Sequence, residues 1–324
     1  MKVLLPDTMP LDFTIPDGSS LLPQGWETIT YNAREVIPET LHDADALVVW
    51  GNSRKNLESA ARQLTQVQLV QSLAAGVDGI IAAGFPSEVP ICTGAGLHCP
   101  TVAEHTLALL LALVRRIPES LQSQARHEWS RELGGLQPLH PEGRLTTLLG
   151  ARILIWGFGE IGQHLAPMLK MLGADVTGIA RTAGKREGFP VICEDALADY
   201  LPSTDVLISI LPATPRTEQI LGADTFARLP KHALVINVGR GATLDENALL
   251  EALRAQRIGG AALDVTAVEP LPEESPLWDA PGLIVTPHGA GGRPVGAPER
   301  IVANLRALAS GKQLIHPVDR SAMQ

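Results

Sequence analysis

The stretch ILIWGFGEIGQHLAPML, residues 153–169, gives the clearest indication of this chain's fold. Its apolar start is typical of a buried strand, and the spacing Gly157-x-Gly159-x-x-Gly162 leads directly into a helical pattern. The first glycine permits a tight turn, the second lets the backbone approach a pyrophosphate, and the third lets the helix pack on the strand. The start of that helix offers unpaired N–H groups and the positive end of a dipole. In this strand–turn–helix context the motif predicts a dinucleotide site rather than an ordinary glycine turn.

Short apolar runs alternate with helical patterns on both sides of this stretch, which indicates parallel α/β sheets. Six strands are predicted from residue 151 onward, which is the full count of a doubly wound, Rossmann-type sheet. They cover residues 151–157, 175–180, 206–211, 233–239, 259–265 and 283–288. Four more are predicted upstream, at residues 1–6, 44–51, 67–74 and 89–94. A long connecting helix is expected over 100–129, and a last helix over 297–311.

The length of 324 residues makes two domains the default. We expect residues 100–288 to form the dinucleotide-binding domain. Residues 1–99, together with 289–324, are expected to form a discontinuous substrate domain. The Gly- and Pro-rich segment 134–143 is predicted to be the loop that ends the connecting region.

Composition excludes several classes of protein. The chain carries 26 Lys and Arg against 35 Asp and Glu, a formal net charge of −9, which does not favour nucleic acid or an anionic membrane as a partner. The longest clean apolar run, residues 107–114, is far shorter than the roughly 20 residues of a membrane span. Three cysteines do not suggest a disulfide framework, and no signal peptide is visible, so we expect a soluble cytoplasmic protein.

The residues after the second strand of the dinucleotide fold bear on the choice of nucleotide. An NAD site usually has Asp or Glu there to bind the ribose 2′-hydroxyl. This chain has Ala180, followed by Arg181, Thr182, Lys185 and Arg186. Basic groups can bind a 2′-phosphate, so the pattern favours NADP(H), with NAD(H) possible. Arg181 stacking on adenine in an NAD enzyme is the alternative.

Three candidate catalytic residues follow predicted strands: Arg240, Glu269 and His288. Ligands bind beyond the carboxyl ends of strands in open α/β sheets, so we expect the three in one site. Arg240 stands in the apolar run that ends in NVGRG, where a buried guanidinium would need an anion.

The stretches that hold these residues, NVGRG, ALDVTAVEPLP and TPHGAG, resemble the active-site motifs of the D-isomer-specific 2-hydroxyacid dehydrogenases, in that family's order. The segment SLAAGVDGI (72–80) is similar to its substrate-carboxylate loop. ALVVWGN, IART, EPLPEESPLW and HPVDR resemble its NADPH-dependent glyoxylate/hydroxypyruvate reductase branch. The resemblance implies two Rossmann-like domains, a flavodoxin-like substrate domain and a doubly wound dinucleotide-binding domain.

The resemblance also implies a role for each catalytic residue. Arg240 would hold the carboxylate and carbonyl oxygen of a 2-oxo acid, since its planar fork suits two oxygens. His288 would donate a proton as hydride reaches the carbonyl carbon, and Glu269 would fix its tautomer and favour its charged form. The expected reaction is reversible reduction of glyoxylate, hydroxypyruvate or another small 2-oxo acid to the D-2-hydroxy acid.

Further binding residues are implied in the same way. Substrate would contact Asn52 and the backbone N–H groups of Ala75, Gly76 and Val77, besides Arg240 and His288. Asp264 would meet the nicotinamide carboxamide. The complete set expected at the cofactor is Gly157, Phe158, Gly159, Glu160, Ile161, Gly162, Arg181, Thr182, Lys185, Leu211, Pro212, Thr217, Val238, Gly239, Asp264 and Ala290.

Other interpretations stay open at this point. A corepressor that senses NAD(H) shares the fold and the catalytic residues, and formate or phosphite dehydrogenases are related. Trp50 and Trp129 are candidates to shape the substrate pocket, with core packing as the alternative for Trp50. Cys92, His98, Cys99 and His105 fit no standard zinc spacing, so no metal is expected. The apolar helix 101–116 is expected to make a homodimer, as in the family.

Overall fold

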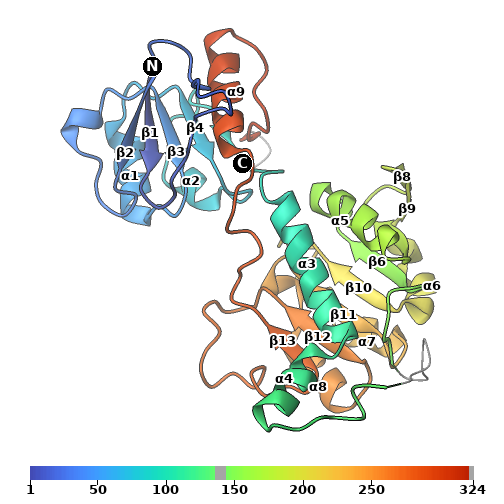
Figure 1. Ribbon diagram of the computed structural model, residues 1–324. Coiled ribbons are helices and arrows are strands. Elements are labelled where there is room, and N and C mark those ends of the chain that lie inside the picture. The colour runs from blue at the N-terminus through green and yellow to red at the C-terminus, as the bar shows by residue number, and fades with distance from the viewer. Residues whose placement is uncertain (136–143, 321–324) are drawn as a thin grey trace. The chain divides into compact units, whose positions relative to one another are not determined.

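The computed structural model describes residues 1–135 and 144–320, and it forms two units (Figure 1). One unit is Met1–His98 with Arg293–Gln324, and the other is Cys99–Gly292. Most of the loop predicted at 134–143 lies outside the described residues. The assignment of substrate binding to the first unit stays a prediction.

The first unit is built on a five-stranded sheet in which every strand pair is parallel. Its order is β2-β1-β3-β4-β5, the flavodoxin-like arrangement. The strands are β1 (Lys2–Pro6), β2 (Glu27–Tyr31), β3 (Ala46–Val49), β4 (Leu69–Ser72) and β5 (Ile91–Cys92). Strand β2 is not predicted from the sequence, because this edge strand is mostly exposed and its sequence ETITY lacks an apolar run.

Helices cover this first sheet. They are α1 (Arg54–Gln63), α2 (Asp78–Ala82) and α9 (Ala297–Ala309), with a short 3₁₀ turn η1 (Glu39–Leu41). The end of the chain returns to this unit as α9, whose buried Ala297, Ile301 and Leu305 recur every four residues and face one side of the sheet. Figure 1 shows α9 beside β4.

The second unit has an eight-stranded sheet of order β13-β12-β11-β10-β6-β7-β9-β8. All pairs are parallel except β8 with β9. The strands are β6 (Arg152–Trp156), β7 (Asp175–Ile179), β8 (Gly184–Arg186), β9 (Phe189–Ile192), β10 (Val206–Ser209), β11 (Leu234–Asn237), β12 (Gly260–Leu263) and β13 (Leu283–Val285). When the seven parallel strands are counted along the chain from β6, their order across the sheet is 7-6-5-4-1-2-3. This is the Rossmann order 3-2-1-4-5-6 with a seventh strand added at the edge.

The expected count of six strands was therefore wrong. The third strand of the Rossmann order is β9, in a hairpin with β8, and not the run at 206–211, which is the fourth. The hairpin has a short polar first strand, and its turn uses Glu187 and Gly188 at φ values of 47° and 84°. A polar strand of three residues carries too little periodicity to be predicted.

Helices of the second unit are α3 (Cys99–Val114), α4 (Ile117–Ala125), α5 (Glu160–Met171), α6 (Leu197–Tyr200), α7 (Ala223–Arg228) and α8 (Glu246–Arg254). This unit also has three short 3₁₀ turns, η2 (Glu194–Ala196), η3 (Leu201–Ser203) and η4 (Gly241–Thr243). The single helix expected over 100–129 is wrong: Arg116 adopts a left-handed φ of 53° and separates α3 from α4. Buried residues of α3 belong to the core of this unit, which accounts for much of its apolar character.

Candidate cofactor and catalytic site

The glycine loop lies between β6 and α5, as the motif predicts, and each glycine has a different surrounding. Gly157 has a φ of 96°, and a Cβ there would lie 2.6 Å from the Ile210 carbonyl oxygen. A Cβ on Gly162 would lie 3.2 Å from the Gly157 oxygen, so this position brings helix and strand together. A Cβ on Gly159 would have nothing within 4 Å. The open space over Gly159, at the start of α5, fits the close approach of a dinucleotide phosphate.

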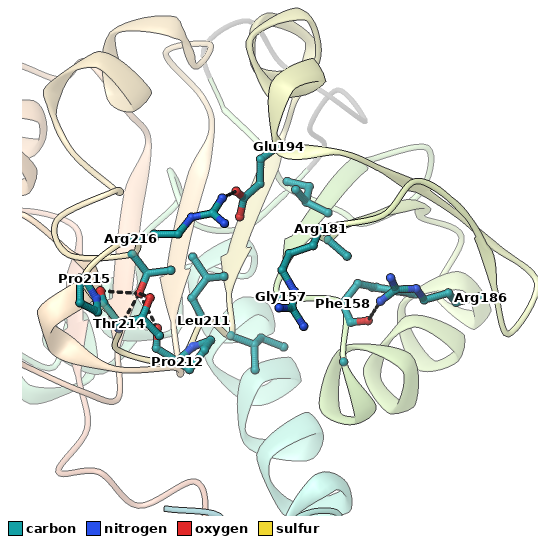
Figure 2. Close-up of a pocket in the computed structure, with 15 residues that line it drawn as sticks. Gly157, Phe158, Arg181, Arg186, Glu194, Leu211, Pro212, Thr214, Pro215 and Arg216 are labelled. Atoms are coloured by element: carbon teal, nitrogen blue, oxygen red, sulfur yellow. Dashed lines mark hydrogen bonds and ion pairs between the residues drawn. The ribbon is translucent and has the colours of Figure 1, made fainter. Parts of the chain in front are cut away.

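A pocket of about 640 Å³ opens beside this loop. Figure 2 shows that its walls come from the glycine loop, the ends of β7 and β9, and the loop after β10. The lining residues are Gly157, Phe158, Gly159, Ile179, Ala180, Arg181, Arg186, Glu194, Ile210, Leu211, Pro212, Thr214, Pro215, Arg216 and Thr217.

Many residues expected at the cofactor line this pocket. They are Gly157, Phe158, Gly159, Arg181, Leu211, Pro212 and Thr217. Thr217 also shapes its own loop, because its hydroxyl donates to the Pro212 oxygen at 2.6 Å and accepts from the Thr214 N–H at 2.8 Å. Glu160, Ile161, Gly162, Thr182, Lys185, Val238, Gly239, Asp264 and Ala290 are not among the lining residues.

Arg186 takes the place in the pocket that was expected for Lys185. Neighbouring side chains in a strand point to opposite faces, so only one of the two can face the pocket. The Arg186 guanidinium donates to the carbonyl oxygens of Phe158 at 3.0 Å and Thr182 at 3.3 Å. Lys185 is exposed on β8.

The pocket also contains a carboxylate, Glu194, although none was expected near the ribose. Glu194 follows β9, which was not predicted as a strand, so its position could not be inferred. Its Oε1 accepts from the Trp156 indole N–H at 3.3 Å, and its Oε2 lies 3.5 Å from Arg216 Nη2. Arg216 was also missed, although it stands in the loop LPATPRTEQIL that supplied other candidates.

His288 and Glu269 form a close pair in the second unit. His288 Nδ1 lies 2.7 Å from Glu269 Oε2, and Glu269 Oε1 accepts the Thr266 backbone N–H at 3.1 Å. With Nδ1 bonded to a carboxylate, Nε2 is the ring atom left to exchange a proton. Both side chains remain partly exposed, at 48% and 37%. The pair lines a second pocket of about 520 Å³, which Trp278 also lines.

Buried Asp264 organises the turn that carries His288. Its backbone oxygen accepts the His288 N–H at 2.8 Å, and its carboxylate accepts from Gly289 N at 2.9 Å and Ala290 N at 3.1 Å. The Thr286 hydroxyl donates to it at 2.7 Å. These bonds hold His288 at a left-handed φ of 49°. The structure thus gives Asp264 a positioning role, and its expected contact with nicotinamide stays a prediction.

Arg240 does not need a buried counter-ion, because it is exposed. The expectation that Arg240 is buried was wrong: β11 ends at Asn237, and Arg240 stands three residues beyond it. The Asn237 side chain fixes this loop by donating to the Arg240 oxygen at 3.2 Å and accepting from Gly239 N at 3.1 Å. Arg240 Nη1 donates to the Gly239 oxygen at 2.7 Å, and its other donors are available for an anion.

The first unit holds the remaining substrate candidates. Ala75 and Gly76 are exposed in the loop between β4 and α2, and Val77 is buried. The Asn52 amide is committed within the protein: it donates to the Tyr31 hydroxyl and to Asn56 Oδ1, both at 2.7 Å, and accepts from Trp50 N at 2.9 Å. These bonds favour a structural role for Asn52.

The tryptophan candidates differ in their surroundings. Trp50 stacks on His98 with ring centroids 5.3 Å apart, in the first unit. Trp129, in the second, is 95% exposed. Within the described residues no group of three or more His, Cys, Asp or Glu could hold a metal ion. In that same part of the chain no helix is long and apolar enough to span a membrane.

Comparison with known proteins identifies the family to which this chain belongs. Residues 107–290 match the model of the D-isomer-specific 2-hydroxyacid dehydrogenase NAD-binding domain. A glyoxylate/hydroxypyruvate reductase A of Yersinia enterocolitica is 32% identical over 90% of this chain and 91% of its own.

Solved structures agree with this result. A D-isomer-specific 2-hydroxyacid dehydrogenase family protein of Aeromonas salmonicida has a TM-score of 0.79 at 29% identity, covering 98% of both chains. An NADPH-dependent glyoxylate/hydroxypyruvate reductase of Sinorhizobium meliloti, in complex with NADP and sulfate, has a TM-score of 0.76 at 27% identity, covering 100% of this chain and 99% of that one. This chain belongs to the D-isomer-specific 2-hydroxyacid dehydrogenase family and is an NAD(P)-dependent oxidoreductase with two Rossmann-like domains.

Proposed function

We propose that this protein reduces glyoxylate and hydroxypyruvate with NADPH as the preferred cofactor. The observation that carries the proposal is the 2.7 Å contact between His288 Nδ1 and Glu269 Oε2, in the unit that also holds the glycine loop. Relatives named glyoxylate/hydroxypyruvate reductase support the choice of substrate.

The chain's own residues supply the acid–base chemistry. A bound nicotinamide would supply the hydride that the carbonyl carbon of the 2-oxo acid accepts. His288 Nε2 donates a proton to the carbonyl oxygen, which becomes the hydroxyl of the product. Glu269 accepts from Nδ1 and so stabilises the imidazolium that must be present before the transfer. The reverse reaction uses the same atoms, with neutral His288 taking the proton.

Arg240 would bind the substrate carboxylate and orient the carbonyl. A guanidinium can donate two parallel hydrogen bonds to such a group, and its exposed position leaves donors for them. In the first unit, the exposed backbone of Ala75 and Gly76 would offer N–H groups to an anion.

The choice of NADPH rests on the walls of the cofactor pocket. Arg181, Arg186 and Arg216 line it, against a single acid, Glu194, so its charged side chains sum to 3 − 1 = +2. A positive pocket favours the additional phosphate of NADPH. The structurally similar reductase of Sinorhizobium meliloti was solved with NADP.

We also propose a cytoplasmic homodimer. The three cysteines are free, which fits a reducing compartment. One face of α3 packs on its own sheet, while Ile117, Leu121 and Trp129 expose apolar surface on α4 and the segment after it. Light scattering on the purified protein gives the mass, and a monomer at micromolar concentration would refute the dimer.

The function is tested by following the oxidation of NADPH and NADH with glyoxylate, hydroxypyruvate and pyruvate, and the reduction of NADP+ and NAD+ with formate and phosphite. We expect the highest kcat/KM with glyoxylate or hydroxypyruvate and NADPH. Oxidation of formate or phosphite without 2-oxo acid reduction would assign the related dehydrogenases instead. Cofactor binding without any turnover would favour a corepressor-like sensor.

A further inference from the structure

We infer that the Arg216–Glu194 ion pair determines cofactor choice: Arg216 screens Glu194 and thereby allows the pocket to accept a 2′-phosphate. The inference rests on nucleotide binding in this pocket, which is part of the proposed function. Neither residue lies in the glycine motif or at the end of β7, where nucleotide preference is usually decided.

Glu194 is held as a fixed anion at the pocket wall. It begins η2 just after β9, and the indole N–H of buried Trp156 donates to its Oε1 at 3.3 Å. Arg181, at the end of the neighbouring strand β7, lines the same pocket. The end of that strand is where the ribose 2′-oxygen lies in dinucleotide folds. An unscreened carboxylate here would repel a 2′-phosphate and would accept a hydrogen bond from a 2′-hydroxyl.

Arg216 supplies the compensating charge. Its Nη2 lies 3.5 Å from Glu194 Oε2, and its side chain is 80% exposed. An ion pair this exposed adds little to folding stability, so its removal should leave the fold intact. Figure 2 shows Arg216 reaching toward Glu194 from the loop after β10, while Arg186 bonds to Phe158 elsewhere in the pocket. Without Arg216, the charged walls sum to 2 − 1 = +1, and Arg186 is already committed to two carbonyl oxygens.

The experiment is a double-mutant cycle that needs no turnover. Calorimetry would measure the affinity of the wild type, R216Q, E194Q and the double variant for adenosine 2′,5′-bisphosphate and for adenosine 5′-monophosphate. We expect R216Q to weaken bisphosphate binding about tenfold or more and monophosphate binding about twofold or less. Adding E194Q should recover most of the loss. R254Q, an arginine at the end of α8, is the matched control and should change neither affinity.

Three results would overturn the inference. Equal losses for both nucleotides in R216Q would show that Arg216 does not read the 2′-phosphate. A loss of the same size with and without E194Q would show that the two residues act independently. Failure of the wild type to bind either nucleotide would show that this pocket is not a nucleotide site. Absence of 2-oxo acid turnover would refute only the proposed function, because the binding cycle is measured without substrate.

Discussion

Replacing Gly159 with alanine separates cofactor binding from stability. A Cβ at this position would meet no protein atom within 4 Å, and the backbone angles, φ −88° and ψ −156°, suit alanine. The free energy of unfolding without cofactor should therefore change by less than about 0.5 kcal/mol. The added methyl would stand where the backbone must approach the pyrophosphate. Losing one charge-assisted hydrogen bond there costs about 1.5–3 kcal/mol, so NADPH affinity should fall at least about tenfold.

Gly157→Ala is the matched comparison, because its effect should appear without cofactor. The new Cβ would lie 2.6 Å from the Ile210 oxygen and 2.8 Å from its carbonyl carbon, at a φ of 96°. A side chain in left-handed backbone costs about 1–2 kcal/mol, and overpacking adds about 1–3 kcal/mol. We expect the melting temperature of this variant to fall by several degrees.

Both variants are measured by thermal melts without nucleotide and by fluorescence titration with NADPH. A Gly159→Ala protein that binds NADPH as tightly as the wild type would refute the placement of the pyrophosphate over this loop. A Gly159→Ala protein that melts well below the wild type without nucleotide would refute the claim that the space over the loop is open.

The other predictions concern catalysis and thiol chemistry. Glu269→Gln removes the charge beside His288 Nδ1 and should lower kcat/KM for 2-oxo acids about tenfold to a hundredfold. The affinity for NADPH should not change. Unaltered steady-state kinetics would contradict a catalytic role for this pair. Arg240→Gln should raise KM sharply and lower kcat/KM for every 2-oxo acid, whereas an unchanged KM would exclude carboxylate binding by this residue. Burial raises the pKa of the Cys92 and Cys99 thiols to about 11, so at pH 8 only about one in a thousand is a thiolate. Iodoacetamide should therefore label Cys193 first, and peptide mapping that finds Cys92 or Cys99 labelled earlier would contradict the burial.

Features encoded in short continuous segments, or in the common direction of parallel strands, could be predicted from the sequence. The glycine loop is one, since strand, turn and helix are neighbours in the chain. The end of the sheet where Arg240, Glu269 and His288 stand is another, because parallel strands bring their carboxyl ends to one edge. The contact between Glu269 and His288 was expected only through the resemblance to the family.

Features that depend on sheet order or on the direction of a side chain could not be predicted. Glu194 follows β9 and Arg216 follows β10, and the two residues meet at one edge of the sheet although β6 and β7 lie between these strands. Because β9 has no clear strand pattern in the sequence, this meeting could not be inferred. Strand alternation put Arg186 rather than Lys185 at the pocket. Arg240 was expected to be buried because it follows an apolar run, although that run ends before it.

The proposed reaction can be tested by identifying the product that the wild-type protein forms from hydroxypyruvate and NADPH. We predict stoichiometric NADPH oxidation and formation of D-glycerate, identified by chiral chromatography. Both should be lost in His288→Gln, although NADPH still binds. L-glycerate, or undiminished turnover in the variant, would contradict it.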